Sequence, residues 1–272
     1  MRKATVFLFA LVLCTAGAVP ALADTAFTMS ERQLMGRLGL SYYVTSNYLD
    51  GEGDRHHLHE AFYREIGGHL TLRWAVLDKV ELGFAAHVIN QYINDKFDEE
   101  NETALGDVEL DTLWRIIGGH RAALGVSAKV KLPYFYDETK PLPPGDGQLD
   151  LEGRVLGGVK ISLFTVGVDV GYRYRDEDPA DLYVCGAEIG FAYNIVYGTL
   201  RLDGHSSVGN EADDAQTVYW QRGPDYDAGY THIQVGIKAG NHWSFDFTAI
   251  YPAYGRNISQ GTMLLLGTNV QY

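Results

Sequence analysis

The stretch GTMLLLGTNVQY, residues 261–272, ends the chain. Every second residue, counted back from the last, is Tyr272, Val270, Thr268, Leu266 and Leu264. This is the two-residue period of a β-strand with one apolar face. A frayed end of a soluble domain has no need of such a pattern. The stretch therefore predicts a strand that is paired up to its last residue.

The same period recurs along the rest of the chain. We count twelve alternating runs, near residues 35–48, 64–77, 80–92, 107–117, 121–133, 149–160, 163–175, 183–193, 195–207, 228–238, 242–251 and 262–272. In the seventh run, Phe164, Val166 and Val168 alternate with polar or small residues such as Asp169. The eighth run alternates less clearly. Each run predicts a strand with one apolar face and one small or charged face.

The connections between the runs are alternately short and long. Short ones lie at residues 78–79, 118–120, 161–162, 194 and 240–241, and long polar ones at 49–62, 94–106, 134–147 and 206–227. Short turns at one end, long loops at the other and an even strand number are typical of a bacterial outer-membrane barrel. The predicted fold class is all-β: an up-and-down antiparallel transmembrane β-barrel of about 12 strands, with short periplasmic turns and long extracellular loops. The last strand should pair with the first, over residues 37–47, because an unpaired edge in hydrocarbon costs several kcal/mol per backbone group.

Aromatic residues distinguish a membrane barrel from a soluble one. The apolar faces carry Trp74, Trp114, Tyr193, Trp243 and Tyr272 near the short turns or the C-terminus, and Tyr48, Tyr92, Tyr172, Tyr174, Tyr183 and Tyr251 near the long loops. Two aromatic belts separated by aliphatic residues fit two lipid–water interfaces. A soluble barrel of the lipocalin kind would instead fill its interior with the apolar face.

The first 23 residues predict an export signal. Two basic residues precede an apolar stretch and a small-residue cleavage site, Ala21-Leu22-Ala23, so the barrel domain is expected over residues 24–272. The formal net charge is −13, and removing Arg2 and Lys3 makes it more negative, which disfavours nucleic acid as a partner. Only Cys185 then remains, so no intrachain disulfide is expected. No later apolar run approaches the roughly 18 residues that a membrane helix needs.

A family resemblance begins at the fourth predicted strand. Its motifs are Gly106-Asp107-Val108-Glu109-Leu110, Trp114-Arg115, Ala128-Lys129-Val130-Lys131-Leu132-Pro133, Val159-Lys160 and Val170-Gly171-Tyr172-Arg173-Tyr174. Over roughly residues 104–194, the chain resembles the outer-membrane family labelled for the meta-pathway of phenol degradation. The resemblance implies a transporter of small, often aromatic, molecules. The chain departs from the family pattern after Pro133, where Tyr134-Phe135-Tyr136 follows.

If the apolar faces contact lipid, the opposite faces line the lumen. The candidate selectivity residues there are Arg37, Glu65, Arg73, Glu81, Glu109, Asp111, Arg115, Lys129, Lys131, Glu152, Arg154, Asp169, Arg173, Glu188, Arg201, Asp203, His205 and His232. Twelve strands enclose more room than eight, whose side chains roughly fill a barrel. One interpretation is a narrow channel whose charges select solutes. The alternative is that the charges pair across the interior and plug it.

Two long loops could contribute to the channel. Loop 206–227 is the longest, and Tyr219, Trp220 and Arg222 are its candidates for a constriction, although it could also be a plain surface loop. In loop 134–147, the aromatic residues Tyr134 to Tyr136 could receive an apolar solute at the mouth. Extending the outer aromatic belt is the use that we favour for them.

Two weaker candidates for a specific chemical site are a hydrolase-like His–Ser pair and a histidine cluster. His205 and Ser207 share one strand face, with Glu211 or Asp213 as a possible orienting acid, as in some outer-membrane lipid hydrolases. Alternation places this pair toward the lumen, whereas those hydrolases act on the lipid side. His56, His57 and His59 could hold a transition metal, yet their spacing matches no strong zinc motif. A solvated loop is the simpler account of this cluster.

The sequence therefore predicts an outer-membrane channel or facilitator for small molecules, aromatic or hydrophobic compounds among them, in a Gram-negative bacterium. The expected partners are outer-membrane lipid, lipopolysaccharide and a small solute, and no cofactor is expected. A barrel that does not conduct and acts as a structural or surface-interaction module is the main alternative. The lipid hydrolase is a minor one.

Overall fold

The computed structural model describes residues 26–58, 61–94, 99–119, 121–136, 142–145, 147–176, 180–208 and 226–272. The strands within these ranges are β1 (Leu34–Thr45), β2 (Asn47–Leu49), β3 (Arg55–His57), β4 (Phe62–Leu77), β5 (Val80–Asn94), β6 (Glu99–Leu105), β7 (Val108–Gly118), β8 (Ala122–Leu132), β9 (Asp150–Ile161), β10 (Phe164–Arg175), β11 (Leu182–Tyr193), β12 (Val196–Ser207), β13 (Asp227–Ala239), β14 (Trp243–Arg256), β15 (Ile258–Ser259) and β16 (Thr262–Gln271). Among the described residues, we find no helix that is long and apolar enough to cross a membrane.

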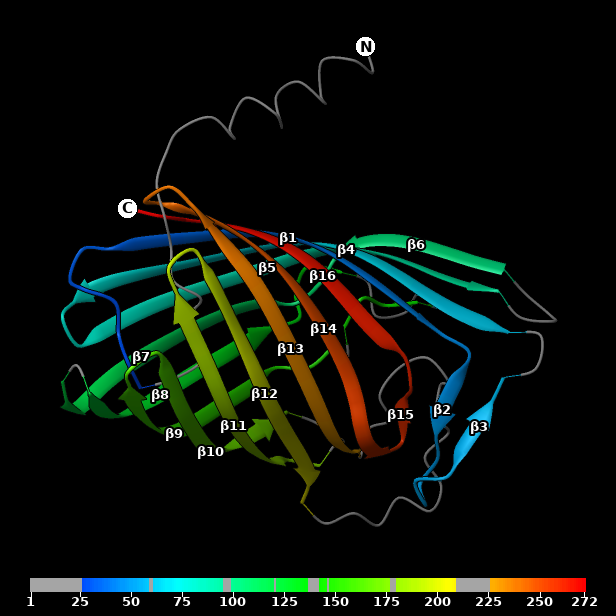
Figure 1. Cartoon of the computed structure of the whole chain (residues 1–272). Helices are drawn as coiled ribbons and strands as arrows, with labels where there is room; N and C mark the ends of the chain where they lie inside the picture. Colours follow the sequence, from blue (N-terminus) through cyan, green and yellow to red (C-terminus); the bar gives the residue numbers. More distant parts are fainter. Residues whose placement is uncertain are drawn as a thin grey trace.

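Twelve strands close into one antiparallel barrel, as predicted (Figure 1). The ring consists of β1, β4, β5, β7 to β14 and β16, and each strand pairs with the next one in this order. The last strand, β16, pairs with β1 from Met35 opposite Gln271 to Val44 opposite Thr262, and its other edge pairs with β14. The predicted pairing of the first and last strands is therefore confirmed, and it closes the ring between β1 and β16.

The two faces of the wall differ in polarity as the alternation predicts. On β10, Val168 and Val170 point outward and are more than half exposed, whereas Asp169 between them is 3% exposed on the inner side. On β1, Leu38 and Leu40 point outward and Ser41 inward. The barrel thus presents an aliphatic outer surface and a polar interior.

The two ends of the barrel also differ. At the short-turn end, on the left of Figure 1, the turns include Ser162, Asn194 and Gly240, which have positive φ and so allow tight reversals. Trp74 and Trp114 are exposed on the outer wall near this end. Tyr172, Tyr183 and Tyr251 are exposed near the opposite, long-loop end. These positions agree with two outward aromatic belts.

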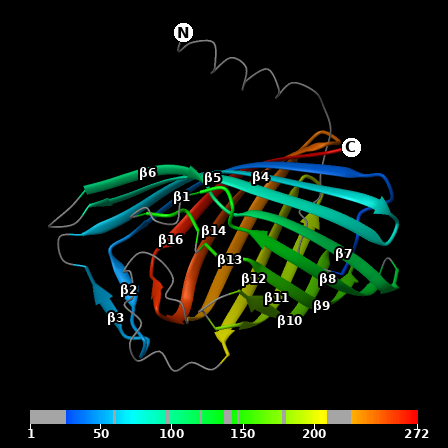
Figure 2. The same cartoon turned by 180° about the vertical axis from the view of Figure 1, so that it is seen from behind.

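One predicted loop contains a strand. Residues 94–106 were expected to be a long polar loop, but Glu99–Leu105 form β6, which pairs with the outer part of β5 from Val88 to Asn94. The first part of β5, from Val80 to Ala85, pairs with β7. The hairpin of β5 and β6 therefore projects beyond β7 (Figure 2). No described strand pairs with the other edge of β6. Its acidic residues misled the sequence analysis, although charge is what protects an exposed strand edge from unwanted pairing.

A small apolar core lies at the long-loop end. A second sheet, in the order β15, β2, β3, folds over the barrel opening. Its Leu49 and Ile258 pack with the inward-facing Leu182 and Val184 of β11, and with Tyr226. Leu182 and Val184 reverse the usual polarity of the wall because this cluster covers them. Their apolar inner face explains why the alternation of the eighth run was weak.

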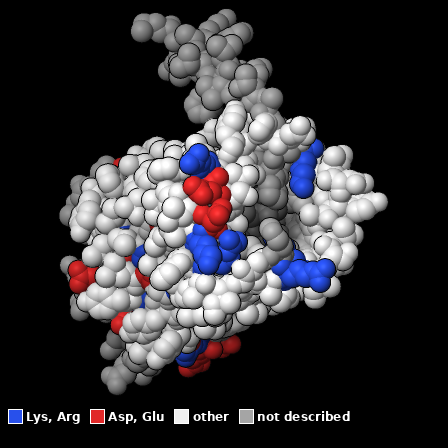
Figure 3. Space-filling view, turned by 90° about the vertical axis from the view of Figure 1, so that its left-hand side faces the viewer, with Lys and Arg blue, Asp and Glu red and all other residues white. Residues whose placement is uncertain are grey.

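The segment before β1, Ala26–Gln33, lies across the short-turn end, and we call it the strap. Backbone hydrogen bonds from Arg32 to Ala75 and from Ala75 to Gln33 tie its last residues to β4. At its other end, Ala26 and Phe27 pack with the inward-facing Leu113, Ala123 and Leu156, from β7, β8 and β9. Figure 3 looks at this end and shows a central row of basic and acidic side chains on a mostly uncharged surface.

Candidate functional site

The barrel encloses a cavity of about 970 Å³. Its lining extends from Phe27 of the strap to Ile258 of the small sheet, so the cavity runs between the two ends of the barrel. The lining includes these predicted lumen residues: Arg37, Glu65, Arg73, Glu81, Glu109, Asp111, Lys129, Lys131, Glu152, Arg154, Asp169, Arg173, Glu188, Arg201, Asp203, His205 and His232. Arg115 lies instead near the short turns, where its guanidinium donates to the backbone oxygen of Asp78.

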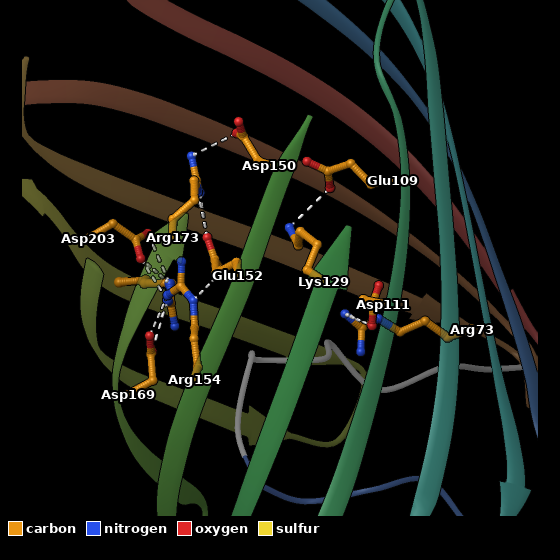
Figure 4. Close-up of polar contacts among 11 residues, drawn as sticks. Arg73, Glu109, Asp111, Lys129, Asp150, Glu152, Arg154, Asp169, Arg173 and Asp203 are labelled. Atoms are coloured by element: carbon orange, nitrogen blue, oxygen red, sulfur yellow. Dashed lines mark hydrogen bonds and ion pairs between the residues drawn. The ribbon is translucent and has the colours of Figure 1, made fainter. Parts of the chain in front are cut away.

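Charged side chains form ion pairs along the side of the wall built by β7 to β13, and several of these pairs share residues (Figure 4). Lys129 on β8 bonds Glu109 on β7 at 3.0 Å, and Lys131 lies 3.2 Å from Asp150 on β9. Further around, Arg173 pairs with Glu152 at 2.6 Å. Further ion pairs join Arg154 to Glu152 and Asp169, and Arg201 to Asp169, Glu188 and Asp203. The Nε2 atom of His232 lies 3.0 Å from the Asp203 carboxylate.

Three arginines reach across a whole strand to an aspartate on the next one. A glycine lies on the strand between in each case, and we call these contacts the three-strand bridges: Arg73 to Asp111 with Gly83 between them, Arg201 to Asp169 with Gly186 between them, and Arg37 to Asp246 with Gly267 between them. A Cβ on Gly186 would stand 2.4 Å from both the Arg201 guanidinium and the Asp169 carboxylate. The missing side chain therefore gives the arginine room to lie flat along the wall.

The ion pairs could run around the barrel wall and leave the lumen open, or run across the interior and fill it. They link residues on the same or nearby strands, around the wall, and the central cavity remains beside them. Asp169 and Glu188 have side chains that are 1% exposed and are held in place by Arg201. Removing one partner of such a buried pair leaves an uncompensated charge, at a cost of about 3–5 kcal/mol. The geometry favours a rigid, charged wall over a plug of pairs across the interior.

The opposite side of the cavity carries aromatic and aliphatic groups beside polar ones such as Arg37 and Glu65. Tyr43 and Tyr63 stand with ring centroids 6.0 Å apart, and Tyr43 shares a hydrogen bond with Ser259. Ile250, Met263 and Leu265 complete this side of the lining, which we call the apolar side. A solute in the cavity would thus meet paired charges on one side and tyrosine rings and aliphatic groups on the other.

Residues of loop 134–147 reach the cavity, although extending the outer aromatic belt was the use favoured for its aromatic residues. The Tyr136 hydroxyl donates to Asp107 at 2.7 Å and accepts from the backbone N–H of Gly147. Pro143 and Pro144 are among the cavity-lining residues. Tyr134 is 73% exposed, so the aromatic run divides between the outside and the lumen. The prolines of this loop were the sequence signal for this arrangement, because they restrict the backbone and so keep the loop at the cavity.

The hydrolase candidate has a different local geometry from the one that catalysis requires. The Ser207 hydroxyl donates to the backbone oxygen of Tyr226 at 2.7 Å and accepts from the Tyr226 backbone N–H. His205 shares a longer contact, 3.4 Å, with the Tyr226 hydroxyl. Ser207 is thus engaged with backbone and not with His205. Glu211 and Asp213 lie outside the described residues.

The histidine cluster of the first long loop makes ordinary polar contacts. His56 shares a hydrogen bond with Asp50 at 2.6 Å, and His57 shares one with Asn47. Desolvation would raise the pKa of Asp50, but the bonds from His56 and from two backbone N–H groups hold it below its usual value. No group of three metal-ligating side chains occurs among the described residues. His59 lies outside them, as do the constriction candidates Tyr219, Trp220 and Arg222.

Two solved structures support the fold assignment. The chain is similar to the COG4313 outer membrane channel from Pseudomonas putida F1, with a TM-score of 0.72 and 10% sequence identity over 93% of this chain and all of that one. It is also similar to the KdgM porin, with a TM-score of 0.50 and 7% identity over 85% of this chain and 98% of that one. No family model and no curated protein matches the sequence. The chain therefore has the fold of outer-membrane β-barrels.

Proposed function

We propose that this chain is an outer-membrane channel for small solutes. The observation that carries the proposal is the cavity of about 970 Å³, lined by charges that pair around the wall and not across it. An aliphatic outer surface between two aromatic belts suits a lipid bilayer. By this proposal, the short-turn end faces the periplasm and the long-loop end faces the outside, next to lipopolysaccharide.

The charges of the lining give the channel a preference for cations. Ten acidic side chains line the cavity: Glu65, Glu81, Asp107, Glu109, Asp111, Asp150, Glu152, Asp169, Glu188 and Asp203. The basic ones are eight: Arg37, Arg73, Lys129, Lys131, Arg154, Arg173, Arg175 and Arg201. An excess of negative charge lowers the energy of a cation in the lumen and raises that of an anion.

Planar-bilayer recordings of the refolded protein test both statements. We expect discrete conductance steps and a potassium-to-chloride permeability ratio above one. Lys129 has a side chain that is 35% exposed to the cavity, so Lys129→Glu should increase this ratio roughly two-fold by adding negative charge along the path.

Arg55→Glu is the matched control, because it makes the same charge change on the exposed strand β3. It should leave the ratio near the wild-type value. A folded barrel that passes no current would overturn the channel proposal and leave the non-conducting, surface-interaction function. Equal ratios in Lys129→Glu and wild type would overturn the role of the lumen charges.

The finer part of the proposal concerns aromatic solutes, which the family resemblance implies. The apolar side, with Tyr43, Tyr63 and Met263, offers rings and aliphatic groups to such a solute. Benzoate should then reduce the single-channel current at lower concentrations than acetate, which has the same charge and no ring. Equal effects of the two anions would remove the aromatic preference and leave the channel itself in place.

A further inference from the structure

The lining of the cavity at the long-loop end includes two segments that lie outside the twelve-stranded ring. One is Ile258–Ser259, which is β15 of the small sheet. The other is residues 143–145, Pro-Pro-Gly, in the connection between β8 and β9, and we call it the proline segment. Because both segments add to the inner surface of the ring, they leave a narrower opening at this end than the ring alone would.

A single hydroxyl group ties the chain on both sides of the proline segment to the wall. The Tyr136 hydroxyl donates to the carboxylate of Asp107, the residue before β7, at 2.7 Å. The same hydroxyl accepts from the backbone N–H of Gly147 at 2.9 Å. Tyr136 precedes the proline segment and Gly147 follows it, so both flanks meet at one point. We call this pair of hydrogen bonds the anchor.

The acceptor of the anchor is itself fixed by the barrel wall. The Asp107 carboxylate lies 3.7 Å from the ammonium group of Lys131 on β8, and that ammonium group lies 3.2 Å from Asp150, the first residue of β9. These three side chains are between 6% and 13% exposed. A hydrogen bond to a charged acceptor is stronger than one between neutral groups. The anchor therefore holds the loop to the long-loop ends of β7, β8 and β9.

The proline segment packs directly on the anchor. A Cβ on Gly145 would stand 2.2 Å from the Tyr136 hydroxyl and 2.6 Å from the Asp107 carboxylate. Because glycine has no side chain, the backbone of the segment reaches the hydrogen bond itself. On the other side of the segment, Leu142 is 1% exposed. The two prolines between them have a restricted φ, so the direction of the segment follows from its fixed ends.

We propose that the proline segment is the size filter of the channel and that Tyr136 is the positioning residue that holds it in the lumen. The filter rests on the proposed channel function. Proline has a rigid ring and no backbone N–H donor, so the segment narrows the lumen with a firm surface that offers a solute few hydrogen bonds. Without the Tyr136 hydroxyl, the segment loses its hold on Asp107 and the opening widens. Larger solutes then gain more permeability than small ones.

Swelling of proteoliposomes measures the filter through solute size. Tyr136→Phe keeps the ring and removes only the hydroxyl. The ratio of raffinose to arabinose influx should rise roughly two-fold over wild type, because a wider opening favours the larger sugar. Both sugars are uncharged, so the charges of the lumen do not distinguish them. The heat-dependent gel mobility of each variant checks that the barrel is folded.

Tyr134→Phe is the matched control. It removes a hydroxyl from the same loop, but Tyr134 is 73% exposed and its side chain lies outside the anchor. The sugar ratio of this variant should stay at the wild-type value. A rise equal to that of Tyr136→Phe would mean that the hydroxyl on Asp107 has no particular role.

A variant of the segment itself tests whether Tyr136 acts through it. Pro143→Ala/Pro144→Ala makes the filter smaller and less rigid, and should also raise the sugar ratio. Adding Tyr136→Phe to this variant should give no further rise, because residues that act as a unit are not additive. Independent, additive increases would overturn the positioning role of Tyr136.

Gly145→Ala reaches the anchor without changing Tyr136. Its methyl group would displace the Tyr136 hydroxyl from Asp107, so the sugar ratio should rise as in Tyr136→Phe. Gly153→Ala, where a Cβ would meet nothing within 4 Å, is the control and should behave as wild type. Should Tyr136→Phe fail to refold, this pair of variants decides the question.

The outcomes separate the filter from the channel. Equal sugar ratios in wild type, Tyr136→Phe, Gly145→Ala and the double-proline variant would overturn the filter and leave the channel intact. Absence of swelling and of current in every folded variant would overturn the channel and the filter with it. A raised ratio in the double-proline variant alone would support the size filter and overturn the role of Tyr136 in holding it.

Discussion

Gly186 and its two counterparts show how a single missing side chain shapes the lumen. In each three-strand bridge an arginine pairs with an aspartate two strands away, and a charged group lies over the glycine between them: both partners at Gly186 and Gly267, and the Asp111 carboxylate at Gly83. Any larger residue in the glycine position would displace the charged group that lies over it. The bridges thus combine three residues whose sizes must match, and they keep the charges flat against the barrel.

Gly186→Ala tests this steric role. The new methyl group would stand 2.4 Å from Arg201 and Asp169, so one of the two must move into the cavity. We expect a loss of about 1–3 kcal/mol in unfolding free energy, because overpacking displaces a buried ion pair. Urea unfolding in detergent, followed by tryptophan fluorescence, measures it.

Gly190→Ala is the matched control for this substitution. Gly190 lies on the same inner face of β11, but a Cβ there would have its nearest neighbour at 3.6 Å, which is ordinary contact. Its unfolding midpoint should stay near that of wild type. Equal midpoints for the two alanine variants would show that the bridge over Gly186 does not need the space.

The sequence could predict which residues face the lumen but not how they meet. A period of two assigns each residue to a face, so nearly all of the predicted lumen residues do line the cavity. Pairing over three strands depends on register, which alternation leaves open. Phe27 was missed, and the use of Tyr136 stayed open, because both lie outside regular strands, where no period marks the inward direction. The period assigns a face but no chemistry, so the roles of the lumen residues in selectivity stay a prediction.

At the scale of elements, β16 closes the ring, because it pairs with β1 on one edge and with β14 on the other. Deleting residues 268–272 would leave part of β1, from Met35 to Leu38, without its partners. Unpaired backbone groups in an apolar environment cost several kcal/mol each, so the truncated chain should not refold in detergent. The unheated sample should lack the faster-migrating folded band on a denaturing gel.

The full-length variant Tyr272→Leu separates the backbone from the terminal ring. It keeps the backbone hydrogen bonds between Leu34 and Tyr272, so it should refold in detergent as wild type does. A truncated chain that refolds equally well would mean that β1 and β14 can close the barrel without the end of β16.

The same scale explains the error at β6. A run with Glu99, Glu100 and Glu102 reads as a loop because glutamate has little preference for strands. The pairing with β5 overrides this preference, since the hairpin continues an existing sheet. Local composition therefore predicted a loop wrongly at a segment that forms a strand by pairing with β5.

At the scale of the whole molecule, the outer surface predicts how deeply the barrel sits in a bilayer. Trp74 and Trp114 are 51% and 53% exposed on the outer wall near the short turns. In proteoliposomes of variants that retain only one of these tryptophans, brominated lipids should quench most strongly with bromine close to the headgroups. Strongest quenching by bromine at the bilayer centre would contradict an interfacial belt.

A tryptophan beyond the membrane is the control. Tyr134→Trp in a tryptophan-free background places the indole at a highly exposed position at the long-loop end. Acrylamide in water should quench it more strongly than any brominated lipid does. Similar lipid quenching at this site and at Trp74 would mean that the bilayer covers more of the protein than the belts indicate.

The seam between β1 and β16 also has a consequence for the speed of assembly. Every other contact in the ring joins strands that are near each other in the chain, whereas this seam joins its two ends. Bringing such distant segments together costs on the order of 5 kcal/mol in loop-closure entropy before any bond between them forms. Hairpins can therefore grow one after another, but the ring closes late. Until then, the unfinished sheet exposes the unpaired backbone edges of β1 and β16. A cell must shield these edges from other chains or catalyse their pairing.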